Sequence, residues 1–489
     1  MLLIGLHLIF GYVADYVLSS LGNKNMRWGF VLLQSLYELY VLWLSFWVLS
    51  SVNFRSYWWV LITGLVLLAG YRLFNRARLI LSPQEPDRLK RSFLRSSAVI
   101  HLTSALLVTA VIYILLAAWP VYVVVIGMSV LMAALTFYHR LIYRLPERTE
   151  HLSDKELPSV SLLVPARNET RELVECLESL VAIDYPKLEI LVVDDCSTNT
   201  KTSQIIKSFA RSGVRFIKGS PPSDSWIGKN NAYQALYEAA SSEWLFFLGT
   251  DIRMGKHSLR NIMSIMGQTD LEMVSIMPFR DIRAQYGLLA PLRHWWEFVL
   301  PREILKRPPV LSTAWLVQKG QLKPFGGLRG VSRSVIPERH IAKHIGANYA
   351  FWLAEPRKTW LSTTKGTRDR YGTAYRHRYP QLKRRVERVA ITSIAMVGFT
   401  VTLLGSIWFA PLIGLVAYAL VGFSVFMPAL TFYGLGGVLR SLLWPLLLLQ
   451  EIAIINYSMY KYELSQVSWS GRNICLPVMR VIKQLPPID

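Results

Sequence analysis

Three polar clusters follow apolar runs in the middle of the sequence and supply the side chains best suited to chemistry. The clusters are Pro165-Ala-Arg-Asn-Glu169 after VSLLV, Asp194-Asp195-Cys-Ser197 after LEILVV, and Gly249-Thr-Asp251 after WLFFL. Any one of them alone is explained equally well as a turn or a helix cap. Carboxylates at several strand ends, however, are suited to accept hydrogen bonds from the N–H and O–H groups of a nucleoside.

The runs that carry these clusters alternate with segments of helical spacing. Strands are expected at 159–165, 188–194, 214–219 and 244–249, and helices at 170–181, 202–211 and 230–240. This alternation predicts an α/β fold with an open, Rossmann-like, mostly parallel sheet. Because parallel strands end at the same edge of a sheet, we expect the three clusters to form one ligand site.

A lysine at the start of the third predicted helix is a candidate for binding phosphate. Lys229 closes the motif Ser225-Trp226-Ile-Gly-Lys229. An ammonium group beside a helix N-terminus favours a diphosphate, since both attract negative charge. The alternative is an ordinary exposed lysine.

The composition is that of a membrane protein. Of 489 residues, 52% are hydrophobic and 18% charged, which excludes an ordinary soluble protein and a disordered one. The 54 basic and 32 acidic residues give a net charge of +22. Beside so many apolar segments, this charge favours anionic lipids or phosphorylated substrates over nucleic acid. The three cysteines form no disulfide or zinc pattern.

Eight apolar stretches approach the roughly 20 residues that a membrane-spanning helix needs. They are 1–21, 28–49, 57–73, 98–118, 121–141, 390–409, 412–432 and 439–457, the last weakened by Glu451. The basic residues around 72–95 and at 384–388 place those loops in the cytoplasm by the positive-inside rule. The sequence therefore predicts a multi-pass protein of the plasma membrane whose segment 143–388 is cytoplasmic.

Three motifs, VSLLVPARNE, ILVVDDCST and WLFFLGTDIR, together resemble the family 2 glycosyltransferases, over roughly residues 157–345. The resemblance implies a GT-A domain that binds a nucleotide sugar, with Pro165, Glu169, Asp194 and Asp195 at the nucleoside. Trp226 and Lys229 resemble the WxGK signature of the carotenoid- and hopanoid-associated branch. Trp469-Ser-Gly-Arg472 resembles the WxGR box of the same branch, and three full C-terminal spans would leave that box on the wrong side of the membrane.

The metal motif departs from the family pattern. Gly249 stands where the first acid of Asp-x-Asp is expected, so Asp251 alone remains to bind the donor and its Mg²⁺ or Mn²⁺. Lys229, Arg253 or Lys256 are alternative partners for the diphosphate, and Asp270 or Asp281 alternative metal ligands. A non-catalytic relative is a further alternative.

The resemblance also implies a carboxylate general base of an inverting reaction. Alignment of Ile341-Ala342 with the Leu-Ala of the family motif assigns this role to Glu338, behind Pro337. The alternative is a glutamate that merely favours the first turn of a helix.

The expected organisation has four parts. Residues 1–142 form an N-terminal transmembrane region, 143–345 the GT-A domain, 346–389 a basic and aromatic segment on the membrane surface, and 390–489 a C-terminal transmembrane region. The expected function is hexosyl transfer from a nucleotide-diphosphate donor to a lipid or polyprenoid acceptor, with no nucleic-acid partner. The alternatives are a processive polysaccharide synthase, which lacks its expected Gln-x-x-Arg-Trp signature here, and a non-catalytic membrane scaffold.

Overall fold

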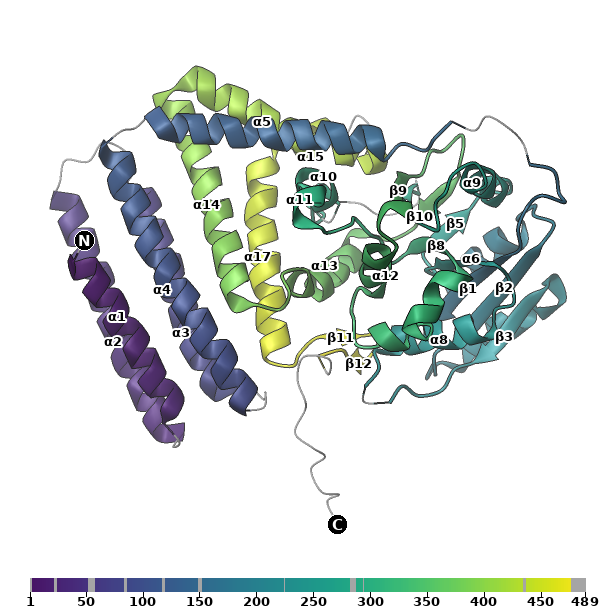
Figure 1. The fold of residues 1–489 in the computed structure, drawn as a ribbon, viewed down its shortest axis with the longest axis horizontal. Helices are drawn as coiled ribbons and strands as arrows, with labels where there is room; N and C mark the ends of the chain where they lie inside the picture. The colour runs from purple at the N-terminus through teal and green to yellow at the C-terminus, as the bar shows by residue number, and fades with distance from the viewer. Residues whose placement is uncertain are drawn as a thin grey trace, which may run out of the picture.

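The computed structural model describes residues 2–21, 24–51, 58–82, 86–116, 119–147, 152–223, 225–281, 287–292, 294–433 and 437–475. An α/β unit lies at one end of the molecule, and the first four helices lie at the other end (Figure 1). Helices α14 and α17 run between these two parts, while α5 and α15 pack side by side along one edge.

Long helices flank the α/β unit in the chain. The N-terminal ones are α1 (Leu2–Ser20), α2 (Lys24–Ser51), α3 (Trp58–Leu81), α4 (Pro86–Leu116) and α5 (Trp119–Ile142). The C-terminal ones are α14 (Val386–Phe409), α15 (Pro411–Tyr433), α16 (Gly437–Leu442) and α17 (Trp444–Glu463).

Within the described residues, three helical stretches are long and apolar enough to cross a membrane: Pro120–Ile142, Val386–Phe409 and Pro411–Leu430. They correspond to three of the eight predicted spans, so membrane association is supported. The other five predicted spans fall on α1 to α4 and α17, which are helical where described. In α17 the buried carboxylate of Glu451 has partners within the protein. It pairs with Arg378 and accepts a hydrogen bond from Trp296 Nε1 at 2.9 Å.

The α/β unit is built on a seven-stranded sheet with the order β3-β2-β1-β4-β8-β6-β9. All strands run parallel except β8, which is antiparallel to both of its neighbours. The strands are β1 (Val160–Ala166), β2 (Leu188–Asp194), β3 (Val214–Lys218), β4 (Trp244–Leu248), β6 (Met273–Met277), β8 (Ala314–Gln318) and β9 (Tyr349–Leu353). The predicted open, mostly parallel α/β sheet is confirmed.

A second sheet and short helices complete the unit. The second sheet has the order β5-β10-β7, with β5 (Ile252–Met254), β7 (Phe279–Arg280) and β10 (Leu361–Thr363). The helices are α6 (Arg171–Val181), α7 (Thr200–Ser208), α8 (Gly228–Ala239), α9 (Ser258–Met266), α10 (Trp295–Val299), α11 (Arg302–Leu305), α12 (Pro337–Ile345) and α13 (Thr367–Gln381).

Strands of both sheets lie beyond residue 345, where the sequence analysis places the end of the GT-A domain. Strand β9 pairs with β6, and β10 pairs with both β5 and β7, so the two sheets continue to Thr363. These two strands are short, and arginine-rich segments follow them, which hid them in the sequence.

Apolar residues on both faces explain why β1 and β4 occupy the centre of the sheet. The side chains of β4 are all buried, and Phe247 stacks on Trp315 of β8 with ring centroids 4.0 Å apart. A strand that is apolar on both faces needs a layer on each side, and such layers hold the strand ends in fixed positions.

Candidate active site

A cavity of about 170 Å³ opens where β1, β2 and β4 end. Its walls include seven of the residues singled out in the sequence: Pro165, Glu169, Asp195, Lys229, Asp251, Trp469 and Arg472. The carboxyl ends of neighbouring parallel strands meet at one edge of the sheet, and this brings the three polar clusters together as expected.

The first two clusters are joined by hydrogen bonds of the backbone and of one arginine. Asp195 N donates to Ala166 O at 2.8 Å. Arg167 Nη1 donates to the carbonyl oxygens of Asp195 and Cys196 at 2.5 and 2.7 Å. Asn168, the next residue of the first cluster, has a φ of 60°, a conformation that asparagine tolerates better than most residues. Arg167 thus positions the loop of the second cluster, a role that the sequence did not indicate.

The two acids of the second cluster have different tasks. Asp194 holds its own loop, because its carboxylate accepts from Ser197 N at 2.9 Å and from the Ser203 hydroxyl. Asp194 does not line the cavity. Asp195 does, and both of its carboxylate oxygens accept from Arg472 Nη1 at 2.7 and 2.8 Å. Of the predicted nucleoside ligands, Asp195 is therefore placed to meet a ligand, whereas Asp194 supports the loop.

The WxGR residues reach the cavity from the far end of the chain. They form the hairpin β11 (Ser468–Trp469) and β12 (Arg472–Asn473) after α17. Arg167 Nε donates to Ser470 O at 2.8 Å, which fastens the hairpin to the first loop. Trp469 and Arg472 thus lie at the site itself. After the α/β unit, the described stretches that are long and apolar enough to cross a membrane lie in α14 and α15, and α17 is not among them.

Lys229 lies in the first turn of α8, as predicted, and faces the cavity. Its ammonium lies 4.9 Å from the ring centroid of Tyr233 and 5.3 Å from that of Trp469, and it donates to Ser312 O at 3.3 Å. The aromatic rings hold a cation without neutralising its charge. Trp226 does not line the cavity and packs, partly buried, against the core around Tyr233 and Phe247.

Asp251 turns its carboxylate toward the position of the missing acid. Thr363 Oγ1 donates to Asp251 Oδ2 at 2.7 Å. A Cβ atom built on Gly249 would lie 2.6 Å from Asp251 Oδ1, so the glycine gives this carboxylate its room.

The residues present do not form a fixed metal site. No group of three or more His, Cys, Asp or Glu side chains with suitable geometry occurs in the described part of the chain. Asp195, the nearest acid of the second cluster, is engaged by Arg472. A divalent ion would have to be bound by Asp251 and by oxygens of the substrate.

Cations outnumber acids around the cavity. Besides Lys229 and Arg472, the lining includes Arg167, Lys365 and Arg376, against the carboxylates of Glu169, Asp195 and Asp251. Such a surplus of positive charge is suited to a ligand that carries a diphosphate.

Helix α13 supplies part of this lining, which sequence reasoning missed. Thr373, Arg376 and His377 line the cavity, and Arg376 lies 5.1 Å from the ring centroid of Trp469. The basic and aromatic composition of 363–378 indicated a membrane surface. The sequence signal for a cavity wall was the threonine, alanine and histidine that share one helix face, and the structure shows that these residues are buried. Contact of this segment with a membrane stays a prediction.

Glu169 is the carboxyl group most affected by its surroundings. Burial raises its pKa to about 7, with the nearby Glu172 and Asp251 carboxylates adding to the rise and a hydrogen bond from Arg167 N opposing it. The group therefore changes charge near neutral pH.

Replacing Glu169 with Gln is expected to change how stability depends on pH. A raised pKa in the folded state means that the native protein loses stability as pH rises from about 4.5 to about 7 and that the loss then levels off. Glu169→Gln removes this loss, so its Tm should exceed that of the parent by a few degrees at pH 8 and match it near pH 4.5. Equal Tm differences at both pH values would show that folding does not raise the pKa of Glu169.

Glu338 does not line this cavity and lies beside a neighbouring one. It is in the first turn of α12, which begins at Pro337 as expected, and its side chain is buried. It lines a smaller second cavity of about 20 Å³ together with Arg302, Arg307 and Arg339. Ser312 and His377 line both cavities, so the two cavities are neighbours.

The second cavity is rich in arginine. Arg302 pairs with Glu297 within it. Burial and the neighbouring Arg339 lower the pKa of Arg307 to about 10, since a guanidinium surrounded by other cations is less stable in its charged form. This environment favours a negatively charged or electron-rich group beside Glu338.

Part of the α/β unit is similar to known proteins. Residues 161–315 match the family described as "Glycosyl transferase family 2". The chain is 26% identical over 168 residues to the 4,4'-diaponeurosporenoate glycosyltransferase of Staphylococcus haemolyticus, covering 34% of this chain and 43% of that protein. It is 31% identical over 139 residues to the probable glycosyltransferase YdaM of Bacillus subtilis, covering 28% and 33%. The matches thus span less than half of these relatives.

Among solved structures, a mannosyltransferase of Pyrobaculum calidifontis in complex with GDP-Man and Mn²⁺ has 16% identity and a TM-score of 0.42, covering 69% of this chain and 98% of that one. TarS of S. aureus in complex with UDP-GlcNAc has 16% identity and a TM-score of 0.34, covering 63% and 92%. The segment 161–315 that matches the family contains the ends of β1, β2 and β4, where the cavity opens.

Proposed function

We propose that this protein transfers a sugar from a nucleotide-diphosphate donor to a lipophilic acceptor. The observation that carries the proposal is the cavity at the strand ends. The segment that matches family 2 supplies the carboxylate of Asp195 and two of the cations, Arg167 and Lys229, while later parts of the chain supply the other cations. The carboxylates accept hydrogen bonds from the nucleoside, and the cations meet the diphosphate.

The charges of the cavity also suit the departure of the nucleotide. When the bond between the sugar and the diphosphate breaks, negative charge grows on the leaving phosphate oxygen. Lys229, Lys365 and Arg376 are cations already held in the cavity wall, so they stabilise this charge with little rearrangement.

The hydroxyl group of the acceptor is proposed to reach Glu338 at the second cavity, whose 20 Å³ is about the space of one water molecule. Glu338 there would remove the proton from an acceptor hydroxyl as the sugar is transferred with inversion, and Ser312 and His377 connect its cavity to that of the donor. A lipophilic acceptor is supported by the apolar helices around the domain and by the names of the Staphylococcus relatives.

A screen of nucleotide sugars for thermal stabilisation tests the donor class. UDP- and GDP-linked hexoses are added to the purified full-length protein, and a bound donor at 100 times its Kd raises the free energy of unfolding by about 2.7 kcal/mol. We expect a shift of several degrees for at least one donor and none for the free hexose. A protein that no nucleotide sugar stabilises would not be a transferase of this class.

The dependence of activity on a divalent metal ion is proposed to be weak, because cationic side chains stabilise part of the charge of the diphosphate. Removal of divalent ions with EDTA should reduce turnover less than Lys229→Met does, since Lys229 faces the donor cavity and Asp251 stands alone as a metal ligand. Gly249→Asp should raise the apparent affinity for Mg²⁺ or Mn²⁺, once Asp251 rotates away from the new side chain. Complete loss of activity in EDTA, with Lys229→Met unaffected, would contradict this.

The site is proposed to lie on the cytoplasmic side, together with the basic residues near the end of α3 and the start of α4. Ser82 at the end of α3 donates to Glu463 O of α17 at 3.1 Å, just before the hairpin that lines the site. A cysteine in place of the exposed Arg91 should therefore react with a membrane-impermeant maleimide only after the cells are permeabilised. Labelling of intact cells would reverse the assignment.

A further inference from the structure

A groove with a polar floor lies between α1 and α2, far from the sheet and outside the segment that the family match covers. Its volume is about 540 Å³, within the usual range for small-molecule sites. The walls are apolar and come from both helices, with Phe10 on α1 and Leu33, Leu36 and Tyr40 on α2. These four side chains are more than half exposed, so something apolar must cover them.

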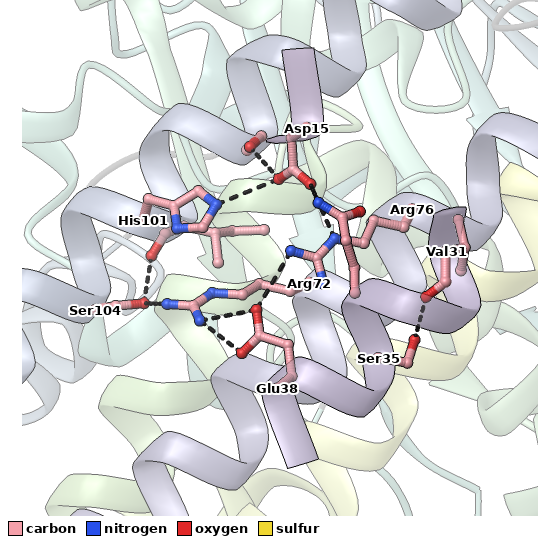
Figure 2. Close-up of polar contacts among 11 residues, drawn as sticks. Asp15, Val31, Ser35, Glu38, Arg72, Arg76, His101 and Ser104 are labelled. Carbon is pink, nitrogen blue, oxygen red and sulfur yellow. Dashed lines mark hydrogen bonds and ion pairs between the residues drawn. The ribbon is translucent and has the colours of Figure 1, made fainter. Parts of the chain in front are cut away.

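The floor of the groove belongs to a buried network that joins α1, α2, α3 and α4 (Figure 2). Arg76 pairs with Asp15 at 2.9 Å and with Glu38 at 3.3 Å, and Arg72 pairs with Glu38 at 2.8 Å. From α4, His101 contacts Asp15 at 3.2 Å. Figure 2 shows Arg72 lying between Glu38 and Ser104, and Asp15 facing both Arg76 and His101.

This network carries no net charge if His101 is neutral. Two carboxylates face two guanidinium groups, and each acid has at least one arginine partner. A ligand with a fixed charge would have to break one of these pairs, which is costly because the charges are buried. The floor therefore favours an uncharged polar group.

Gln34 lies in this floor, and one of its hydrogen-bonding atoms has no partner in the network. Its residue is 8% exposed, it lines the groove, and its Oε1 has no hydrogen-bond partner among the described residues. Its Nε2 donates to Asp15 Oδ1 at 3.5 Å. This contact fixes the orientation of the amide, because a carboxylate accepts hydrogen bonds only and would repel Oε1.

We propose that the groove between α1 and α2 binds a long-chain lipid with an uncharged hydroxyl head. The hydroxyl donates its one proton to Gln34 Oε1, since the carboxylate of Glu38 on the same floor is engaged by Arg72 and Arg76. The hydrocarbon chain lies along Phe10, Leu33 and Leu36 and covers their exposed surfaces. The site is separate from the donor cavity, since α3, α4, α14 and α17 lie between the groove and the sheet (Figure 1).

Photolabelling of the full-length protein in lipid nanodiscs tests the proposal. The probe is a long-chain alcohol with a diazirine on its chain, and labelled peptides are identified by mass spectrometry. We expect labelling on α1 and α2, and competition by hexadecanol at about one tenth of the concentration at which hexadecyl phosphate competes. Equal competition by the phosphate would overturn the proposal, because it would indicate an anion site or simple partitioning.

Two variants and a control locate the ligand. Gln34→Leu keeps the size of the side chain and removes the acceptor, so labelling should fall about tenfold, as for the loss of one buried hydrogen bond. Ala14→Phe, on the opposite wall, should also abolish labelling by filling the groove. Leu32→Ala changes an exposed apolar residue that does not line the groove and should leave labelling intact.

The outcomes that contradict the proposal are also distinct. Undiminished labelling in both Gln34→Leu and Ala14→Phe would place the lipid elsewhere. If the parent is not labelled and Gln34→Leu halves the mass of the solubilised particle, the groove is instead a contact between two copies of the chain. Because Ala14→Phe leaves the polar network untouched, it gives an answer even if Gln34→Leu fails to fold.

Discussion

Asp195→Asn is expected to weaken the binding of the nucleotide-sugar donor by about 10- to 100-fold. The carboxylate is buried at the carboxyl end of β2 and is held by Arg472, and burial raises its pKa while the arginine opposes the rise. Replacing one oxygen by an NH₂ group removes an acceptor of charge-assisted hydrogen bonds and puts a donor against Arg472. Isothermal titration with the donor found in the screen measures the loss.

The neighbouring acid provides a matched control. Asp194→Asn changes the same chemical group one residue earlier, but Asp194 faces its own loop and does not line the cavity. We expect Asp194→Asn to lower Tm and to leave donor affinity within about threefold of the parent. If both variants lose binding equally, the effect is one of loop structure, and Asp195 has no direct contact with the donor.

The central sheet could be predicted because its sequence signals are local and strong. Apolar runs such as those of β2 and β4 end in Asp and Gly residues, and the expected strands agree with the observed ones to within one or two residues. The helices between them start and end near the predicted positions. Convergence of the three clusters then followed from parallel pairing alone.

The remaining wall of the site depends on contacts between distant parts of the chain. Arg472 meets Asp195 across 277 positions, and nothing in the local sequence of either residue specifies this pairing. Helix α13 was interpreted from its composition, although its buried face is set by packing against α17, where Tyr379 N donates to Ser458 Oγ at 3.1 Å. Composition describes a segment, whereas only the tertiary structure shows which side of it is covered.

At position 249 the sequence showed that an acid of the metal motif is missing, but it did not show how Gly249 and Asp251 lie relative to each other. The missing acid was evident from the motif. The room that Gly249 leaves for Asp251, and the hold of Thr363 on that carboxylate, required the pairing of β5 with β10. Likewise, the sequence analysis assigned Arg72 to a cytoplasmic loop, whereas in the structure Arg72 lies inside α3 and pairs, buried, with Glu38 of α2.

Glu338→Gln is expected to lower kcat by about 100-fold or more while donor affinity stays within about twofold of the parent. Glutamine keeps the shape of the side chain and loses its basicity, and a missing general base typically costs factors of 10² to 10⁴. Donor binding is unaffected because Glu338 lines the second cavity and not the first.

Glu297→Gln is the matched control for this variant, since Glu297 lies in the same cavity but is engaged by Arg302. We expect Glu297→Gln to reduce Tm, because it leaves a buried arginine without its partner, and to change kcat much less than Glu338→Gln does. Single-turnover kinetics with saturating donor separates the two effects. Near-normal turnover in Glu338→Gln would exclude Glu338 as the base and reduce its role to the first turn of α12, where an acidic side chain favours the helix dipole.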